Sequence, residues 1–179
     1  MYTIAKFPTK VFFLKRLLIA TLMGATFFLT GCSPEYNWRE LTVADGRAVV
    51  AFPAKVQTES RIFKLDQHTL EFSLTSAAVK QNLFAVGYAA LPTELNQDQQ
   101  TAIKNTLLKS LAANVGTTLP SSAQNGEPFI LESVSARPIR MVARVLIHRG
   151  YLIQFVATGP SSDLNTTITE EFMRSISLR

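Results

Sequence analysis

Apolar and polar residues alternate along most of the chain after residue 37, and this period of two predicts β-strands. Eight such segments follow one another. They span residues 38–43, 47–52, 57–65, 68–75, 83–91, 129–134, 139–148 and 151–158. The segment at 83–91 is nearly all apolar, which predicts a strand that is buried on both faces of its sheet.

Short turn signals join neighbouring strands and predict antiparallel hairpins. Asp45-Gly46 is a strong signal, because both central positions of a type I′ turn need a positive φ. Asp66-Gln67 predicts a second two-residue turn; a longer loop is the alternative, since glycine is the easiest residue at the second position. The shorter turn would place five apolar side chains on one face of the hairpin. They are Phe63, Leu65, Leu70, Phe72 and Leu74.

Apolar residues recur every three or four positions in two segments, which predicts amphipathic helices. The first helix spans residues 96–115, where Asn96 and Gln99 resemble a capping box and Gly116 is placed to end the helix. Its apolar face consists of Ile103, Leu107, Leu111 and Val115. The second helix is predicted with Ser161 or Ser162 as its N-cap. Its apolar face consists of Leu164, Ile168, Phe172 and Ile176.

This order of hairpins, helix, hairpins and helix predicts an α+β fold, an antiparallel sheet of about seven to eight strands with two helices packed on it. The pattern resembles the PsbP-like family in four parts of the chain. These are Phe52-Pro53-Ala54-Lys55, Val86-Gly87-Tyr88, the strand at 151–158 and the closing helix with Phe172. The resemblance covers about residues 36–178 and implies a small accessory domain that binds partners and has no transferable catalytic residues.

The leader has the pattern of a secretory signal peptide. Its first sixteen residues carry four basic side chains and no acidic one, and residues 17–29 are apolar except for two threonines. This apolar run is too short to span about 30 Å of hydrocarbon as a helix. It ends in Leu29-Thr30-Gly31-Cys32, which resembles the lipobox of bacterial lipoproteins residue for residue.

The lipobox resemblance implies that residues 1–31 are removed and that the Cys32 thiol receives a diacylglycerol group, usually followed by acylation of the new amino group. Cys32 is the only cysteine, so it has no partner for an internal disulfide, and lipidation gives it a role. The alternative is an ordinary secretory leader followed by a free thiol. In the family, an Asp after the cysteine favours the inner membrane; here Ser33 follows, which favours the outer membrane. Residues 32–37 would then tether a domain of residues 38–179 to that membrane, facing the periplasm.

The composition of the mature part indicates an ordinary domain with little net charge. Removing 31 of the 179 residues leaves 148, which is one domain by length. The leader takes four of the 18 basic side chains and none of the 13 acidic ones, which leaves 14 against 13. The basic character of the precursor therefore comes mostly from the leader, and we expect no nucleic-acid partner.

The sequence contains none of the common catalytic or phosphate-binding motifs. His68 and His148 are far apart in sequence, and a zinc site would need further ligands. Glu170 and Glu171 are adjacent on a predicted helix and point about 100° apart, so they do not converge as an acid–base pair. We therefore expect no enzyme activity, no catalytic residues, no metal and no cofactor.

One cluster of basic residues is a candidate site. In the strand at 139–148, Arg140, Arg144 and His148 point to one face, because even separations along a strand keep side chains on the same side. The functional interpretation is an anion or headgroup site, since arginine matches the geometry of carboxylates and phosphates. The alternative is a solvated sheet face, with Glu132 or Glu71 as partners.

The leading hypothesis is a membrane-anchored periplasmic lipoprotein that acts as a non-catalytic binding or assembly accessory module for a protein partner in the envelope. Two alternatives stay open. A small-ligand or lipid carrier would need a sizeable apolar cavity. An enzyme with a site built from scattered residues would need a cleft with converging polar groups.

Overall fold

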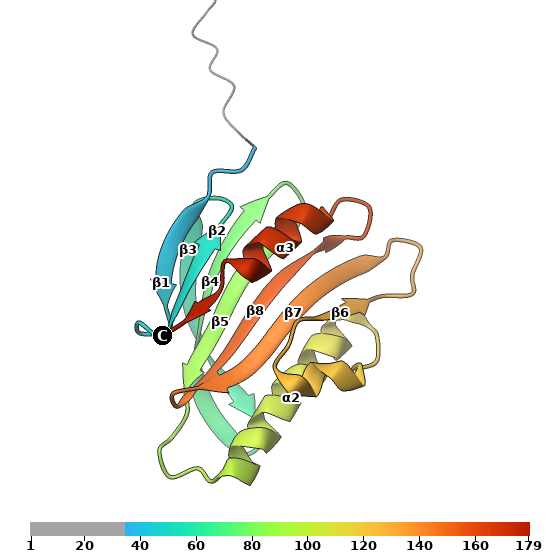
Figure 1. Cartoon of the computed structure of the whole chain (residues 1–179). Helices are drawn as coiled ribbons and strands as arrows, with labels where there is room; N and C mark the ends of the chain where they lie inside the picture. Colours follow the sequence, from blue (N-terminus) through green and yellow to red (C-terminus); the bar gives the residue numbers. More distant parts are fainter. Residues whose placement is uncertain (1–34) are drawn as a thin grey trace, which may run out of the picture. The chain divides into compact units, whose positions relative to one another are not determined.

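Six antiparallel strands form the main sheet of the domain (Figure 1). In spatial order they are β3 (Val56–Leu65), β4 (His68–Val79), β5 (Asn82–Ala90), β8 (Tyr151–Pro160), β7 (Ile139–His148) and β6 (Phe129–Glu132). The computed structural model describes residues 35–179, and Glu35–Arg179 form one compact unit. The predicted leader and Cys32 lie outside the described residues.

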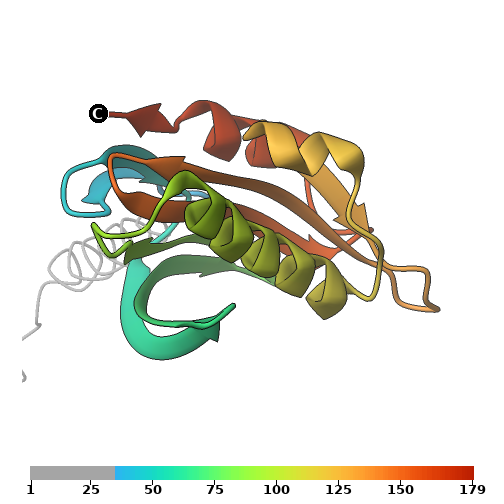
Figure 2. The ribbon, with the colours of Figure 1, turned by 90° about the horizontal axis from the view of Figure 1, so that it is seen from below.

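Two helices and a smaller sheet cover the two faces of the main sheet (Figures 1 and 2). The helix on one face is α2 (Gln97–Val115). The opposite face carries α3 (Thr166–Arg174) and a three-stranded sheet of β1 (Arg39–Val43), β2 (Ala48–Phe52) and β9 (Ser177–Leu178). A short 3-10 helix, η2 (Ser121–Asn125), precedes β6.

The core beneath α2 is built from the apolar face of the helix. Six of its side chains are buried, and they are Ile103, Leu107, Leu108, Leu111, Ala112 and Val115. Alternate residues of the strands meet them, such as Met141 and Val145 of β7. The β3–β4 hairpin curls toward the helix, as Figure 2 shows, so that Leu65 and Phe72 belong to the same core.

The core on the opposite face is centred on three phenylalanine rings. Phe172 of α3 makes edge-to-face contacts with Phe52 of β2 and Phe84 of β5, at centroid distances of 5.8 and 5.5 Å. In β8 the side chains alternate between the two cores, with Val156 facing α2 and Phe155 facing α3. The main sheet is therefore buried on both faces at its centre, which confirms the prediction for the apolar strand that became β5.

The structure confirms the α+β class and the local signals that defined its elements. Asn96 and Gln99 form the predicted capping box: the Asn96 side chain accepts from the Gln99 N–H at 2.9 Å, and the Gln99 side chain accepts from the Asn96 N–H at 3.0 Å. Gly116 ends α2 with a φ of +77°. The shorter of the two alternatives for the β3–β4 turn is correct, because Leu65 pairs directly with His68.

Several details differ from the sequence predictions. The helix α3 is shorter than expected, so that Leu164 and Ile176 lie outside it. The N-cap of α3 is Asn165, whose side chain accepts from the Ile168 N–H at 3.2 Å, and not Ser161 or Ser162. The strand β9 was not predicted; it pairs with β2, and β1, β2 and β9 form a second sheet beside the main one. The turn at Asp45-Gly46 is present, with positive φ at both residues, but it lies within a four-residue connection between the paired ends of β1 and β2.

Candidate functional site

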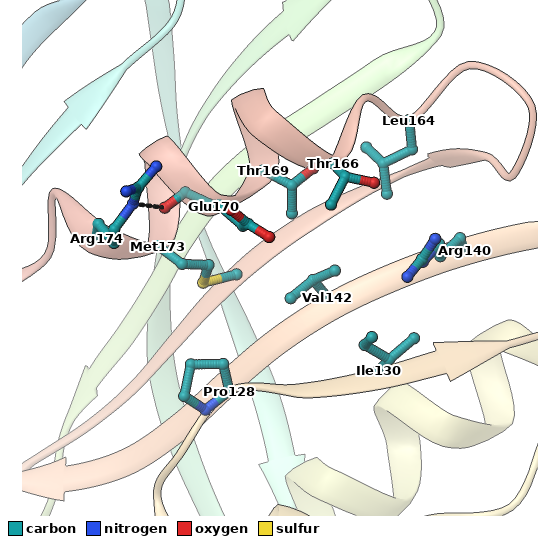
Figure 3. A pocket seen from close by; sticks show the side chains of 10 residues that line it. All are labelled: Pro128, Ile130, Arg140, Val142, Leu164, Thr166, Thr169, Glu170, Met173 and Arg174. Atoms are coloured by element: carbon teal, nitrogen blue, oxygen red, sulfur yellow. Dashed lines mark hydrogen bonds between the residues drawn. The ribbon is translucent and has the colours of Figure 1, made fainter.

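A groove of about 370 Å³ lies between α3 and the outer strands β6 and β7 (Figure 3). We call it the α3 groove. Its apolar lining consists of Pro128, Ile130, Val142, Leu164 and Met173. Its polar lining consists of Arg140, Thr166, Thr169, Glu170 and Arg174. The α3 groove is thus an apolar surface with charged groups around it, as in many small-ligand sites.

The α3 groove exists because α3 is short and is held over the centre of the sheet. Asn165 starts the helix, and Phe172 fixes it to the core below. The side chains that β6 and β7 present on this face therefore keep contact with solvent. Ile130 is 50% exposed, and Val142, directly opposite it in the sheet, is half-buried.

Arg140 is the candidate binding residue in the α3 groove. Its Nε is buried and has no hydrogen-bond partner within residues 35–179. Glu132 lies directly opposite Arg140 in β6, yet no ion pair joins these two side chains in the described part of the chain. A buried donor without a partner is costly, and an anionic group in the groove would satisfy it.

Glu170 and Arg174 come from α3 and border the other part of the α3 groove. The Arg174 Nε donates to the Glu170 backbone carbonyl at 3.3 Å. Figure 3 shows Val142 between the Glu170 carboxylate and the Arg140 guanidinium, so the two charges are separated across the apolar floor. Arg140 is therefore the cation at one end of the groove, whereas Glu170 and Arg174 place charges of both signs at the other end, so an anion is attracted most strongly to Arg140.

The predicted trio of Arg140, Arg144 and His148 shares one face of β7, but each side chain has different neighbours. Only Arg140 lines the α3 groove. The Arg144 Nε donates to the Gly126 carbonyl at 2.8 Å, which fastens the loop before β6. The His148 Nε2 lies 2.8 Å from the Arg179 carbonyl. An anion site that uses all three side chains stays a prediction. Glu71, the other suggested partner of these basic residues, lies opposite Ile62 in the β3–β4 hairpin.

A second polar cluster, which sequence reasoning missed, joins the β1–β2 connection to the β7–β8 turn. The Tyr151 hydroxyl donates to the Asp45 carboxylate, and this hydrogen bond, followed by burial, raises the pKa of Tyr151. The Arg47 guanidinium lies 3.9 Å from the centre of the Tyr151 ring, and its Nε donates to the Arg149 carbonyl at 3.2 Å. These groups satisfy one another and fasten two turns together, so we assign them a structural role.

The other candidates for chemistry do not assemble into a site in the described residues. Within residues 35–179, no three histidine, cysteine or acidic side chains come together as potential metal ligands. Over the same residues, no helix combines the length and the apolar character that a membrane crossing requires. Glu170 lines the α3 groove, whereas the adjacent Glu171 does not.

The comparisons with known proteins give a likeness of fold. No protein-family model and no curated protein matches the sequence. The solution structure of cyanobacterial PsbP (CyanoP) from Synechocystis sp. PCC 6803 aligns with 83% of this chain and 96% of its own chain. The two sequences are 10% identical over the alignment, and the TM-score is 0.44.

Proposed function

We propose that this chain is a lipid-anchored envelope protein that acts as a non-catalytic binding module, with the α3 groove as its binding site. The ligand has an apolar body and one anionic group. The observation that carries this proposal is the buried, unpartnered Nε of Arg140 beside an apolar floor. Lipidation at Cys32, the outer-membrane location and the periplasmic orientation rest on the lipobox and on Ser33.

The size and chemistry of the α3 groove support a small amphiphilic ligand. Its volume of about 370 Å³ lies within the range of known ligand sites. The apolar body would lie on Ile130 and Val142 and would remove their side chains from water. The anionic group would accept from the Arg140 guanidinium, whose forked donors match a carboxylate. Among the earlier alternatives, this geometry favours a small-ligand carrier over an enzyme.

Calorimetric titration with decanoate and decanol tests the binding site, because the two probes share a chain length and differ in charge. We expect decanoate to bind more tightly than decanol. Arg140→Gln should weaken decanoate binding by about tenfold or more, which corresponds to the loss of one charge-assisted hydrogen bond. Glu170→Gln should strengthen decanoate binding, because it removes a repulsive charge from the groove.

Arg144→Gln is the matched control for this titration. Arg144 lies on the same face of the same strand, outside the α3 groove, and already donates to the Gly126 carbonyl. The control should leave decanoate binding unchanged. Equal losses in both arginine variants, or equal affinity for decanoate and decanol, would show that the groove does not select an anion through Arg140.

The anchor is tested separately from the groove. Globomycin or the Cys32→Ala substitution should block processing, and mass spectrometry of the mature protein should find acyl chains on Cys32. Sucrose-gradient fractionation should place the wild-type protein with the outer membrane. An unmodified thiol on Cys32, or a mature chain that keeps residues 1–31, would contradict the proposal of a lipid anchor.

A second candidate function, contact with a protein partner, is favoured by the exposed edge of the main sheet at β3. This strand is ten residues long, and Ile62 is 76% exposed on it. Long exposed edges accept further strands through backbone hydrogen bonds. A photocrosslinker at Ile62 should give one adduct of defined mass in intact cells, whereas the same group at Gln124 of η2 should not. Equal adducts at both positions would exclude a specific contact at β3.

A further inference from the structure

The described chain begins at a fixed point beside the β4–β5 turn. The Glu35 carboxylate forms an ion pair with the Lys80 ammonium at 2.7 Å, and the Asn37 N–H donates to the Pro53 carbonyl at 2.8 Å. The hydrogen bond to Lys80 also lowers the pKa of Glu35. Segments from two sides of the domain therefore hold residues 35–37 at one end of the main sheet, which we call the tether end.

The tether end also includes the β6–β7 loop and the segment between β8 and α3. The Ser161 N–H donates to the Pro138 carbonyl at 2.9 Å, and the Asn82 side chain donates to the Asp163 carbonyl at 3.1 Å. A hollow runs from Gln81, next to Lys80, to Arg137 and Ile139. The β4–β5 turn and the β6–β7 loop are therefore parts of one surface.

Two apolar side chains on the tether end are exposed to solvent. Val134 in the β6–β7 loop is fully exposed (101%), and Ile139 at the start of β7 is 44% exposed. The loop between them is closed at its base, because the Ser133 N–H donates to the Ile139 carbonyl at 3.0 Å and the Ser133 hydroxyl accepts from the Ile139 N–H at 2.8 Å. Val134 therefore directly follows a residue that these two hydrogen bonds fix.

The number of residues between Cys32 and Glu35 limits how far the tether end can lie from a membrane to which Cys32 is anchored. Cys32 lies three residues before Glu35. Three extended residues span at most about 11 Å. If acyl chains are attached to Cys32, as the proposed function holds, Glu35 cannot lie further than this distance from the lipid headgroups. The tether end must then face the bilayer at close range.

We infer that the tether end is a docking surface for a phospholipid bilayer, in which Val134 and Ile139 enter the boundary between headgroups and acyl chains. Arg137 lines the same hollow as Ile139 and can meet lipid phosphates, and Lys80, which pairs with Glu35, lies next to that hollow. Apolar side chains that are exposed in water lose that exposure in the bilayer. Arg140 follows Ile139 in β7, so the cationic part of the α3 groove lies next to this surface.

Site-specific labelling tests this inference, because lipidation of Cys32 leaves no other thiol in the chain. Val134→Cys and Ile62→Cys are each labelled with the environment-sensitive fluorophore NBD in the lipidated protein, which is then placed in phosphatidylethanolamine–phosphatidylglycerol vesicles. Ile62 is the matched control, since it is an exposed aliphatic residue about 20 Å along β3 from its tether-end start. NBD at position 134 should shift to shorter wavelengths and be quenched by brominated lipids, and NBD at position 62 should not.

The same experiment separates failure of the docking surface from failure of the anchor. Wild-type protein that reacts with NBD at Cys32 would show that the lipid anchor is absent. Wild-type protein that does not react, combined with an aqueous spectrum at position 134, would overturn the docking surface alone. Equal quenching at positions 134 and 62 would also overturn it, because the domain would then have no fixed orientation on the bilayer.

Discussion

The two faces of the main sheet are covered to different extents. On one face α2 extends over 19 residues and buries six of its side chains. On the other face α3 has only nine residues, of which Thr169 and Phe172 are buried, and the β1–β2–β9 sheet covers a further part. The first face is therefore covered by α2 over β6, β7 and β8 and leaves only a smaller hollow of about 260 Å³ between α2 and the β3–β4 hairpin, whereas the second leaves the outer side chains of β6 and β7 open as the α3 groove.

The strand β7 contributes side chains to both faces of the main sheet. Met141, Ala143 and Val145 are buried beneath α2. Arg140 and Val142, which alternate with them, line the α3 groove. Alternate residues of this one strand thus pack in the core and line the candidate site. Substitutions at alternate positions should change stability and binding separately, and the following predictions test this.

The largest expected effect is that of Phe172→Ala. The ring is fully buried and packs edge-to-face against Phe52 and Phe84, so its removal should lower the free energy of unfolding by about 3–5 kcal/mol. Because Phe172 also holds α3 in place, decanoate binding should weaken under conditions in which the protein is still folded. Urea unfolding and calorimetry measure the two effects. Loss of stability with unchanged binding would show that the position of α3 does not define the groove.

Leu108→Ala makes the corresponding change on the face that α2 covers. Leu108 of α2 is fully buried, and its truncation should cost about 2–5 kcal/mol of stability. The substitution leaves every residue of the α3 groove in place, so the affinity for decanoate should equal that of the wild type. The same urea and calorimetric measurements apply. A parallel loss of affinity would mean that the two faces are coupled through the sheet.

The sequence predicted those parts of the fold that depend on neighbouring residues. The capping box of α2 and the turn at Asp66-Gln67 are each determined by a few residues that are close together in the sequence, and the structure confirms both. The strand β9 could not be predicted in this way, because Ser177 and Leu178 have no pattern of their own and pair with β2. The N-cap of α3 was misplaced because residues after β8 first form a turn, in which the Leu164 N–H donates to the Pro160 carbonyl.

The candidate site was predicted only in part. The alternation of β7 correctly placed Arg140 on a face outside the α2 core. The sequence did not show that Arg140, Ile130 and Met173 line one groove, since three separate elements bring them together. It also grouped Arg140 with Arg144 and His148, although the partners of those two side chains, Gly126 and Arg179, come from other segments. The alternation of apolar and polar residues along a strand predicts which face of the sheet a side chain occupies, but it does not predict which other elements cover that face.

A smaller effect is expected when the cap of α3 is removed. Asn165→Ala deletes the side chain that accepts from the Ile168 N–H and should cost about 1 kcal/mol. Asn96→Ala, the matched change at the start of α2, should cost a similar amount. Only the first should weaken decanoate binding, because α3 borders the groove and α2 does not. Circular dichroism with urea unfolding gives the stabilities, and equal effects of both variants on binding would contradict the separation of the faces.

The smallest expected change in stability is that of Val142→Thr, which replaces a methyl group by a hydroxyl on the floor of the α3 groove. Val142 is half-buried and its new hydroxyl can reach water, so the free energy of unfolding should change by less than about 0.5 kcal/mol. Val145→Thr, three residues further along β7, places the same hydroxyl in a fully buried position beneath α2 and should cost about 1–3 kcal/mol.

The two valine variants should have opposite profiles in a decanoate titration. Val142→Thr should weaken binding, because an apolar ligand would lie against the hydroxyl, whereas Val145→Thr should bind as the wild type does while it remains folded. Valine and threonine side chains have nearly equal volumes, so differences in packing contribute little to the comparison of the two variants. If both variants lose the same stability, the α3 groove is closed in solution, and the difference between the two faces of the sheet does not exist there.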